Sequence, residues 1–387
     1  MKLILRLLAG ILAGLLIGLY APDALVRLML TVKMALGQLI GFVIPLIILF
    51  FIASGIANLQ ANGGKLLGRT VSIAYGSTLT AGILAYLVAS SLVPMLVESR
   101  PLQEVAGSSL TPFVVIEVPA LFGVMSALAA AFIFGLGISV TGASSLKKVV
   151  DEGKGIIDAL LAKVIIPMLP FYIAGVFAGF GADGSVFETL KTFGVVLVMA
   201  ILMHWLYISV LYIVTGLRSG RSPWALIRTM LPAYVTALGT MSSAATIPVT
   251  LRQAKANGVT PEVANFSIPL FASIHLAGST ITLTTCSIAV MQMMPDLAIP
   301  GLLEMLPFIM MLGVVMIAAP GAPGGAVMAA LGLLTAMLGF GEAAVALMIA
   351  LYMAQDSFGT ACNITCDGAL SIWVDKAEAA EVAQAKA

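Results

Sequence analysis

The chain has 387 residues, of which 60% are hydrophobic and only 10% are charged, and its formal net charge is +1. Its mean hydropathy is +1.11. Soluble domains carry about 25% charged residues, so this composition excludes a soluble globular protein and indicates one that crosses a membrane several times.

Apolar stretches of about 20 residues, the length that crosses a bilayer as a helix, predict six helices in the first part of the chain. They cover 3–20, 27–57, 69–96, 110–146, 155–182 and 186–216. Beyond residue 222, clusters of Pro, Gly and Ser interrupt the apolar stretches 224–252 and 298–336. Such backbone is tolerated at membrane depth only where it is buried in protein or lines a cavity. We therefore predict two re-entrant hairpins there, and two further spans at about 260–293 and 339–374.

Loop charge predicts the orientation of these spans. With the N-terminus in the cytoplasm, most basic residues fall in cytoplasmic loops, as membrane proteins prefer. These residues are Lys65, Arg69, Lys147, Lys148, Lys154, Arg218, Arg221, Arg228, Arg252 and Lys255. Both termini are then cytoplasmic, and the two hairpins enter from opposite sides of the plasma (inner) membrane. Opposed hairpins are typical of transporters with inverted repeats.

The last predicted span carries polar residues that a simple membrane helix would not need. Asp356, Thr360, Asn363 and Asp367 follow one another at steps of four, three and four, which puts them on one helix face. A carboxylate inside a membrane is costly and usually marks an ion or substrate site. The sequence therefore predicts such a site on this face.

Four motifs in order carry a resemblance to a known family. They are Ser-Ser-Ala-Ala-Thr-Ile-Pro-Val-Thr at 242–250, Ile-Pro-Leu-Phe-Ala-Ser-Ile-His-Leu-Ala-Gly-Ser at 268–279, Gly-Ala-Pro-Gly-Gly at 321–325, and Gln-Asp-Ser through Asn-Ile-Thr-Cys-Asp at 355–367. The chain resembles the dicarboxylate/amino acid:cation symporters, which have the glutamate-transporter fold, and its motifs are most similar to the sodium/serine-threonine branch. The resemblance implies an all-α protein with eight transmembrane helices, two re-entrant hairpins and inverted repeats, which works as an elevator and forms a homotrimer.

The same resemblance implies a division into two domains. A static scaffold comprises helices 1 and 2 (1–68) and helices 4 and 5 (110–185). A sliding transport domain comprises helix 3 (69–109) and residues 186–374, which hold helix 6, hairpin 1 (224–252), helix 7 (260–293), hairpin 2 (298–336) and helix 8 (339–374). Residues 375–387 are expected to form a cytoplasmic tail.

The resemblance also implies a substrate site, because residues of this chain stand at the positions of the family's substrate-binding residues. Asp356 matches the family residue that holds the substrate's ammonium group, and Asn363 and Ser243 match residues that bind its α-carboxylate, partners that a zwitterion needs in a low dielectric. Members that carry acidic amino acids place an Arg three residues after that Asp, where this chain has Gly359. We therefore expect a small neutral amino acid such as serine, threonine or alanine. Because Gly359 also leaves room, a somewhat larger side chain stays an alternative. The full expected set is Ser242, Ser243, Ser279, Ala322, Ala326, Asp356, Gly359, Thr360 and Asn363.

Sodium is the expected coupling ion, and no other cofactor is expected. Its expected ligands are Asp367, Asn363, His275, Ser273, Ser77 and Thr78, whose oxygens suit a hard cation. The family motif Asn-Met-Asp-Gly-Thr reads His-Leu-Ala-Gly-Ser at 275–279, so the third sodium site of the family is expected to be absent or altered. His275 is either a neutral, hydrogen-bonded side chain in a polar notch or a proton carrier that replaces a lost sodium.

Three alternatives to a sodium-coupled carrier of neutral amino acids stay open. The first is proton coupling, and the second is an acidic amino acid or dicarboxylate substrate. The third is an ion channel, because re-entrant hairpins also build selectivity filters; a built anchor for a zwitterion argues against it. Enzymatic activity is not expected, since no base with an orienting carboxylate accompanies the serines at 242–243. The expected partners are the substrate, membrane lipid and two further copies of the chain, with no nucleic acid.

Overall fold

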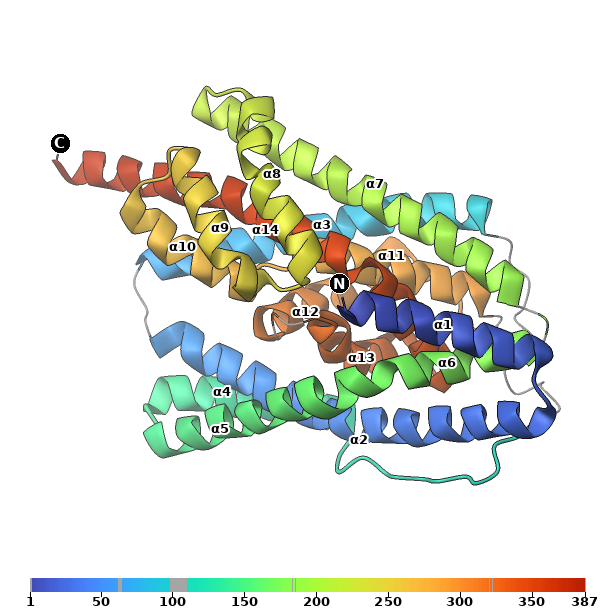
Figure 1. The fold of residues 1–387 in the computed structure, drawn as a ribbon. Coiled ribbons are helices and arrows are strands. Elements are labelled where there is room, and N and C mark those ends of the chain that lie inside the picture. Colours follow the sequence, from blue (N-terminus) through green and yellow to red (C-terminus); the bar gives the residue numbers. More distant parts are fainter. Residues whose placement is uncertain are drawn as a thin grey trace.

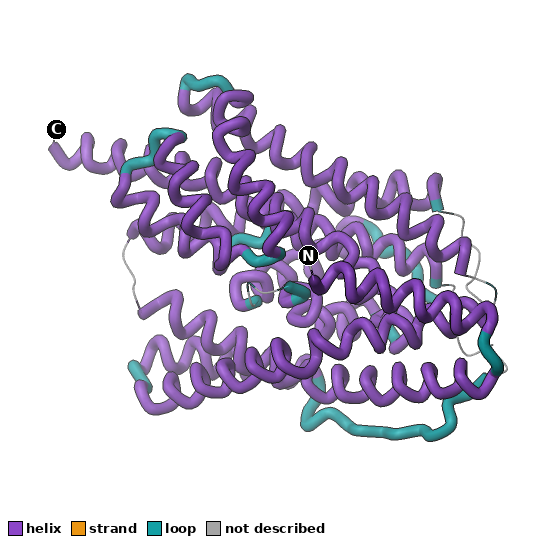
Figure 2. Tube along the Cα trace, in the orientation of Figure 1, coloured by secondary structure: helices purple, strands orange, loops and turns teal. Residues whose placement is uncertain are grey.

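The computed structural model describes residues 2–61, 65–97, 110–182, 184, 186–294, 296–319, 321 and 323–386. These residues form helices joined by turns and loops, with no strand among them (Figure 2). The helices are α1 (Lys2–Tyr20), α2 (Asp23–Ala61), α3 (Lys65–Leu96), α4 (Val124–Thr141), α5 (Ser144–Leu160), the π-helical turn η2 (Leu161–Ile165), α6 (Ile166–Ala182), α7 (Val186–Ser219), α8 (Pro223–Thr240), α9 (Ser243–Ala256), α10 (Pro261–Ile274), α11 (Ala277–Met293), α12 (Leu302–Ala318), α13 (Gly325–Leu338) and α14 (Glu342–Lys386).

Several of these helices can cross a membrane. Within the described residues, seven segments are long and apolar enough: Asp23–Asn58, Lys65–Leu96, Val124–Thr141, Ser144–Ala182, Thr189–Ser219, Pro261–Met293 and Glu342–Glu381. Shorter apolar helices lie at Leu5–Tyr20, Leu302–Ala318 and Gly325–Leu338. The chain is therefore a multi-pass membrane protein, and the count of eight spans stays a prediction because the first helix is short.

Both interrupted stretches fold into helical hairpins. The first stretch turns at Met241, which has a left-handed φ of 54°, and α9 begins beside α8. Ser242 caps this new helix, because its side chain accepts a hydrogen bond from the backbone N–H of Ala245. In the second stretch, α12 and α13 pack on each other and Gly324, with φ of 74°, precedes α13 (Figure 1).

The prediction of one helix over 110–146 is wrong at its beginning. Residues 110–123 are extended, and the helix occupies only Val124–Thr141. Pro112 and Pro119 each lack the backbone N–H that a helix needs. Thr111 and Val118 instead bind side chains of α2: Arg27 donates to the carbonyl of Thr111 at 2.8 Å, and the Val118 N–H donates to Gln38 at 3.0 Å.

The next helix also begins earlier than the predicted residue 155. Gly142, with φ of 66°, ends α4 and donates its N–H to the carbonyl of Ile138. A left-handed glycine at this position commonly stops a helix. The continuous helix of α5, η2 and α6 then starts at Ser144, so Lys147, Lys148 and Lys154 lie on a helix and not in the predicted loop.

The end of the chain continues the last helix. We predicted a span over 339–374 followed by a helix-prone charged tail, and α14 runs unbroken through both to Lys386 (Figure 1). Arg69, near the start of α3, ties this extension down with ion pairs of 2.6 Å to Glu381 and 3.3 Å to Glu378.

The helices pack in two groups. The first group contains α1, α2, α4, α5 and α6, and the second contains α3 and α7–α14. Within the first group, Gly10, Gly14 and Gly18 face α6 so closely that a Cβ at any of them would collide with its backbone. Small residues spaced by four let membrane helices approach in this way. The two groups meet where α12 and α13 contact α2.

Candidate functional site

The polar face of α14 lies inside the second group. Asp356, Thr360, Asn363 and Asp367 are all buried, Asp367 completely, and α14 packs there against α7, α8 and α11. A helix face with two carboxylates thus points into protein and not toward lipid, where such groups would be costly.

Asp356 is held by hairpin 2. Its Oδ2 accepts a hydrogen bond of 2.8 Å from the backbone N–H of Gly324, at the start of α13. No ion pair joins Asp356 to a Lys, Arg or His in the part of the chain that the structure describes. Its carboxylate is therefore buried with neutral partners only.

Asn363 holds the beginning of α11. The helix of predicted span 260–293 breaks at His275 and Leu276, so the first N–H groups of α11 lack partners within the helix. Asn363 Oδ1 accepts from the N–H of Gly278 at 2.7 Å and of Ser279 at 3.2 Å. Its Nδ2 donates to Ser279 Oγ at 3.1 Å. The side chain of Asn363 on α14 thus binds Ser279 on α11, and both residues belong to the predicted substrate site.

Glycines let α11 and α14 cross at this point. A Cβ added to Gly278 would lie 2.6 Å from Cys362 Cβ, and one added to Gly359 would lie 3.3 Å from Thr282 Oγ1. Gly359 is the position at which the resemblance places an Arg in carriers of acidic amino acids. Here α11 passes at about van der Waals distance, since the carbonyl oxygen of Gly278 would lie 3.5 Å from a Cβ at this position.

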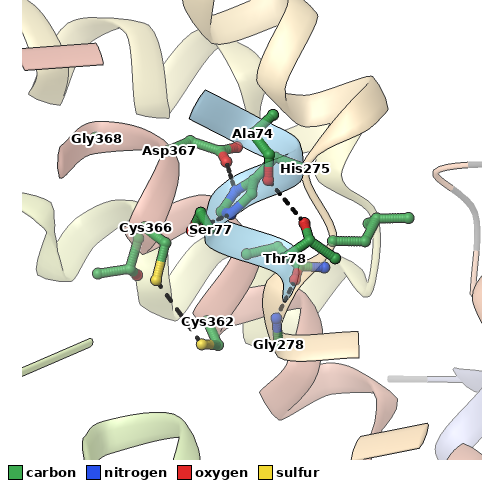
Figure 3. Close-up of polar contacts among 12 residues, drawn as sticks. Ala74, Ser77, Thr78, His275, Gly278, Cys362, Cys366, Asp367 and Gly368 are labelled. Carbon is green, nitrogen blue, oxygen red and sulfur yellow. Dashed lines mark hydrogen bonds and ion pairs between the residues drawn. The ribbon is translucent and has the colours of Figure 1, made fainter. Parts of the chain in front are cut away.

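The side chain of His275 lies beside Asp367, the predicted sodium ligand (Figure 3). Its Nδ1 is 2.7 Å from Asp367 Oδ1, and its Nε2 is 2.9 Å from Ser77 Oγ on α3. Ser77 Oγ in turn is 2.7 Å from the hydroxyl of Tyr207 on α7. Asp367 Oδ2 is buried without a hydrogen-bond partner among the described residues. The histidine therefore joins α14 to α3, while one carboxylate oxygen stays open for a ligand.

Two other predicted ion ligands, Thr78 and Ser273, donate hydrogen bonds to carbonyls of their own helices. Thr78 donates to the carbonyl of Ala74 in its own helix at 3.0 Å, close to the histidine (Figure 3). Ser273 is exposed and donates to the carbonyl of Pro269 at 3.1 Å. The structure thus brings Asp367, His275 and Ser77 together, whereas the side chain of Ser273 lines a cavity near the hairpin tips.

The tips of the two hairpins are joined. Ser242 Oγ donates to the carbonyl of Gly321 at 3.0 Å. The neighbouring Ser243, in the first turn of α9, is buried, and so is Ala326 in the first turn of α13. Ala322 lies outside the described residues. Four predicted substrate residues belong to the two hairpin segments of the sequence: Ser242, Ser243, Ala322 and Ala326.

Two tyrosines of this region, Tyr352 and Tyr207, were not predicted from the sequence. Tyr352 lies one turn before Asp356 on α14, is completely buried, and its hydroxyl lies beside the side chains of Asp356 and Ser279. Buried hydroxyls are normally satisfied, and these two predicted substrate residues are the polar groups next to this one. The four-residue spacing from Asp356 was the signal that could have found it. Tyr207, beside Ser77, had no such signal because its contact is between distant helices.

The chain is similar to known proteins over most of its length. The model of a family described as the sodium:dicarboxylate symporter family matches residues 3–377. Three relatives, from Acinetobacter baumannii strains AYE, AB307-0294 and AB0057, are each named serine/threonine transporter SstT. Each is 27% identical over 354 residues, which cover 86% of this chain and 86% of the relative. The similarity therefore includes every helix that contributes to the site.

Proposed function

The chain belongs to the sodium:dicarboxylate symporter family, and from this premise we propose that it carries a small neutral amino acid, such as serine, threonine or alanine, together with sodium. As a member of that family it is a secondary symporter and not an enzyme. Three relatives named serine/threonine transporters support the choice of substrate.

The observation that carries this proposal is the environment of Asp356. A buried carboxylate without a cationic partner is expensive, and the ammonium group of an amino acid supplies the missing charge. Gly359 offers no positive charge for an acidic side chain, and α11 occupies the neighbouring space. The site therefore favours a zwitterion whose side chain is neutral and small.

The remaining predicted residues take complementary roles in this proposal. Asn363 and Ser243 donate to the α-carboxylate, and Ser279 faces the side chain of the substrate, where its hydroxyl suits serine or threonine. Tyr352 lies one turn from Asp356 and adds a hydroxyl to the same region. The rest of the site is formed by Ser242, Ala322, Ala326, Gly359 and Thr360.

Sodium coupling follows from the family and from the chemistry around Asp367. Asp367 Oδ2 is the open oxygen there, and we assign it to a sodium ion together with backbone carbonyls of the α10–α11 break at His275. Asn363, Ser77 and Thr78 complete the proposed ligand set, whereas Ser273, whose side chain lines the cavity near the hairpin tips, is left out of it. Oxygen donors of this kind suit a hard cation.

We assign the elevator domains to the two packing groups. Residues 1–68 and 110–185 form the scaffold, and residues 69–109 and 186–374 form the transport domain. The contacts of α12 and α13 with α2 then belong to a sliding interface. In the same proposal three copies assemble through their scaffolds in the plasma membrane, with both termini and the tail at 375–387 in the cytoplasm.

Reconstitution in liposomes tests the proposal. We expect labelled serine, threonine or alanine to accumulate under a sodium gradient and not without one, and excess aspartate or succinate to compete poorly. Uptake of aspartate or succinate alone would overturn the substrate assignment. A current that persists without any substrate would favour the channel alternative.

Proton coupling is the second candidate, because the imidazole of His275 lies between Asp367 and Ser77. An imidazole is suited to exchange protons near neutral pH. If His275 carries the coupled proton, His275→Gln should change the pH profile of uptake while leaving sodium dependence in place. An unchanged pH profile in this variant would leave His275 with a structural role, as a donor or acceptor that joins α3 to α14.

A further inference from the structure

A cavity of about 650 Å³ lies between the two packing groups, next to the hairpin tips. One wall contains Ser242 and Gly321, from the tips of hairpins 1 and 2. The opposite wall contains Asn58 of α2 together with Lys154 and Asp158 of α5. In the orientation proposed above, this cavity opens toward the cytoplasm, because it lies near the end of α2 and the start of α3.

The tip of hairpin 2 contacts both this cavity and the substrate anchor. Gly321 lines the cavity and accepts the hydrogen bond from Ser242, while Gly324, three residues further on, donates to Asp356. If these two contacts break together, the shortest way from Asp356 past Gly324 and Gly321 leads to the cavity. In the cavity an amino acid would lie next to the charged side chains of α5, Lys154 and Asp158.

Helix α5 carries three pairs of a lysine and an acidic residue spaced by four residues, and two of these pairs form ion pairs. Lys147 and Asp151 form an ion pair of 2.6 Å, and Lys148 and Glu152 form one of 3.8 Å. Lys154 and Asp158 have the same four-residue spacing, which places them on one face of the helix.

Lys154 and Asp158, both among the described residues, do not form an ion pair with each other. The side chain of Asp158 has no ion pair or hydrogen bond among the described residues, and the ammonium group of Lys154 lies over the Phe51 ring, 5.5 Å from its centre, as a cation–π contact. A positive and a negative group thus face the same cavity from adjacent turns and remain available to a ligand.

We propose that Lys154 and Asp158 form a second, weaker site for the transported zwitterion on its path between Asp356 and the cytoplasm. Asp158 binds the ammonium group and Lys154 binds the carboxylate, the complementary charges that an amino acid offers. This inference rests on the proposed function, since it takes the substrate to be a neutral amino acid. The site is weak because its charges are half-exposed and water competes for them.

Transport measured separately from the two faces tests this site. Lys154→Gln, Asp158→Asn and the double variant are compared with wild type in right-side-out and inside-out vesicles. We expect KM for serine from the cytoplasmic face to rise about fivefold, the effect of losing a partly exposed charge contact. The KM from the external face should stay within about twofold, a change of less than half a kcal/mol.

The chain offers a matched control on the same helix. Lys148→Gln with Glu152→Gln removes an equal number of charges from a pair that is exposed to 78% and 67% and does not line the cavity. This double variant should leave both KM values unchanged. Equal effects of the control and the cavity variants would overturn the site in favour of a general effect of charge.

A binding measurement gives a second readout that does not depend on transport. Saturation-transfer NMR with millimolar serine should detect weak binding to Asp356→Asn, and the signal should disappear when Lys154→Gln and Asp158→Asn are added. A signal that survives these additions would overturn the site. If wild type transports serine and the cavity variants change neither KM nor this signal, only the second site fails; if wild type transports no neutral amino acid, the proposed function fails with it.

Discussion

Asp356→Asn is expected to abolish uptake of neutral amino acids. The substitution keeps the size of the side chain but removes the charge that the substrate's ammonium group would pair with. Breaking a buried charge pair by changing one partner commonly costs about 3–5 kcal/mol, which corresponds to at least a hundredfold loss of affinity. Labelled serine uptake at saturating sodium, and the increase of Tm that serine confers on the purified protein, both measure this loss.

The control for this variant removes an acidic group elsewhere. Glu117→Gln changes an exposed carboxylate in the extended segment 110–123 and should leave uptake at the wild-type level. An Asp356→Asn protein that still binds serine within about threefold of wild type, less than 1 kcal/mol, would show that another group receives the ammonium. Loss of binding with an unchanged Tm of the substrate-free protein would locate the defect in the site and not in folding.

Gly278→Ala is expected to disable the protein by separating two helices. The added Cβ would lie 2.6 Å from Cys362 Cβ and 3.1 Å from Asn363 Oδ1, so α11 must move away from α14. Overpacking of this kind costs about 1–3 kcal/mol. Movement would also break the 2.7 Å hydrogen bond between the Gly278 N–H and Asn363, leaving a buried amide without its partner. We expect a lower Tm and no measurable serine uptake.

Gly76→Ala provides the matched control, since Gly76 also lies within a helix but a Cβ there has no neighbour within 4 Å. Alanine is the better helix former by about 1 kcal/mol, so this variant should be as stable as wild type or more so. Uptake by Gly278→Ala at the wild-type rate would mean that α11 and α14 do not need this close crossing for transport.

Local pattern was enough to predict the elements that carry the site. The steps between Asp356, Thr360, Asn363 and Asp367 follow from the helical period alone, and the structure buries all four. The hairpins could be predicted because Gly, Pro and Ser clusters interrupt helices wherever they occur. The failure at 110–123 has a local cause as well: apolar composition was given more weight than Pro112 and Pro119.

Contacts between distant helices could not be predicted in this way. Nothing near His275 in the sequence indicates that its ring reaches both Asp367 and Ser77, which are 92 and 198 residues away. Likewise Lys154 and Asp158 look like the other charge pairs of α5, and only the cavity formed with the hairpin tips distinguishes them.

The sequence by itself therefore determined the membrane location, the order of helices and hairpins, and the presence of a polar face with Asp356 at its centre, because hydropathy, helical period and chain-breaking residues act over short ranges. The tertiary structure decided which polar groups meet. It placed His275 against Asp367, brought α11 next to Gly359, joined the hairpin tips through Ser242 and left Asp158 open to a cavity. Such contacts depend on how whole helices pack against one another, and no short segment contains that information.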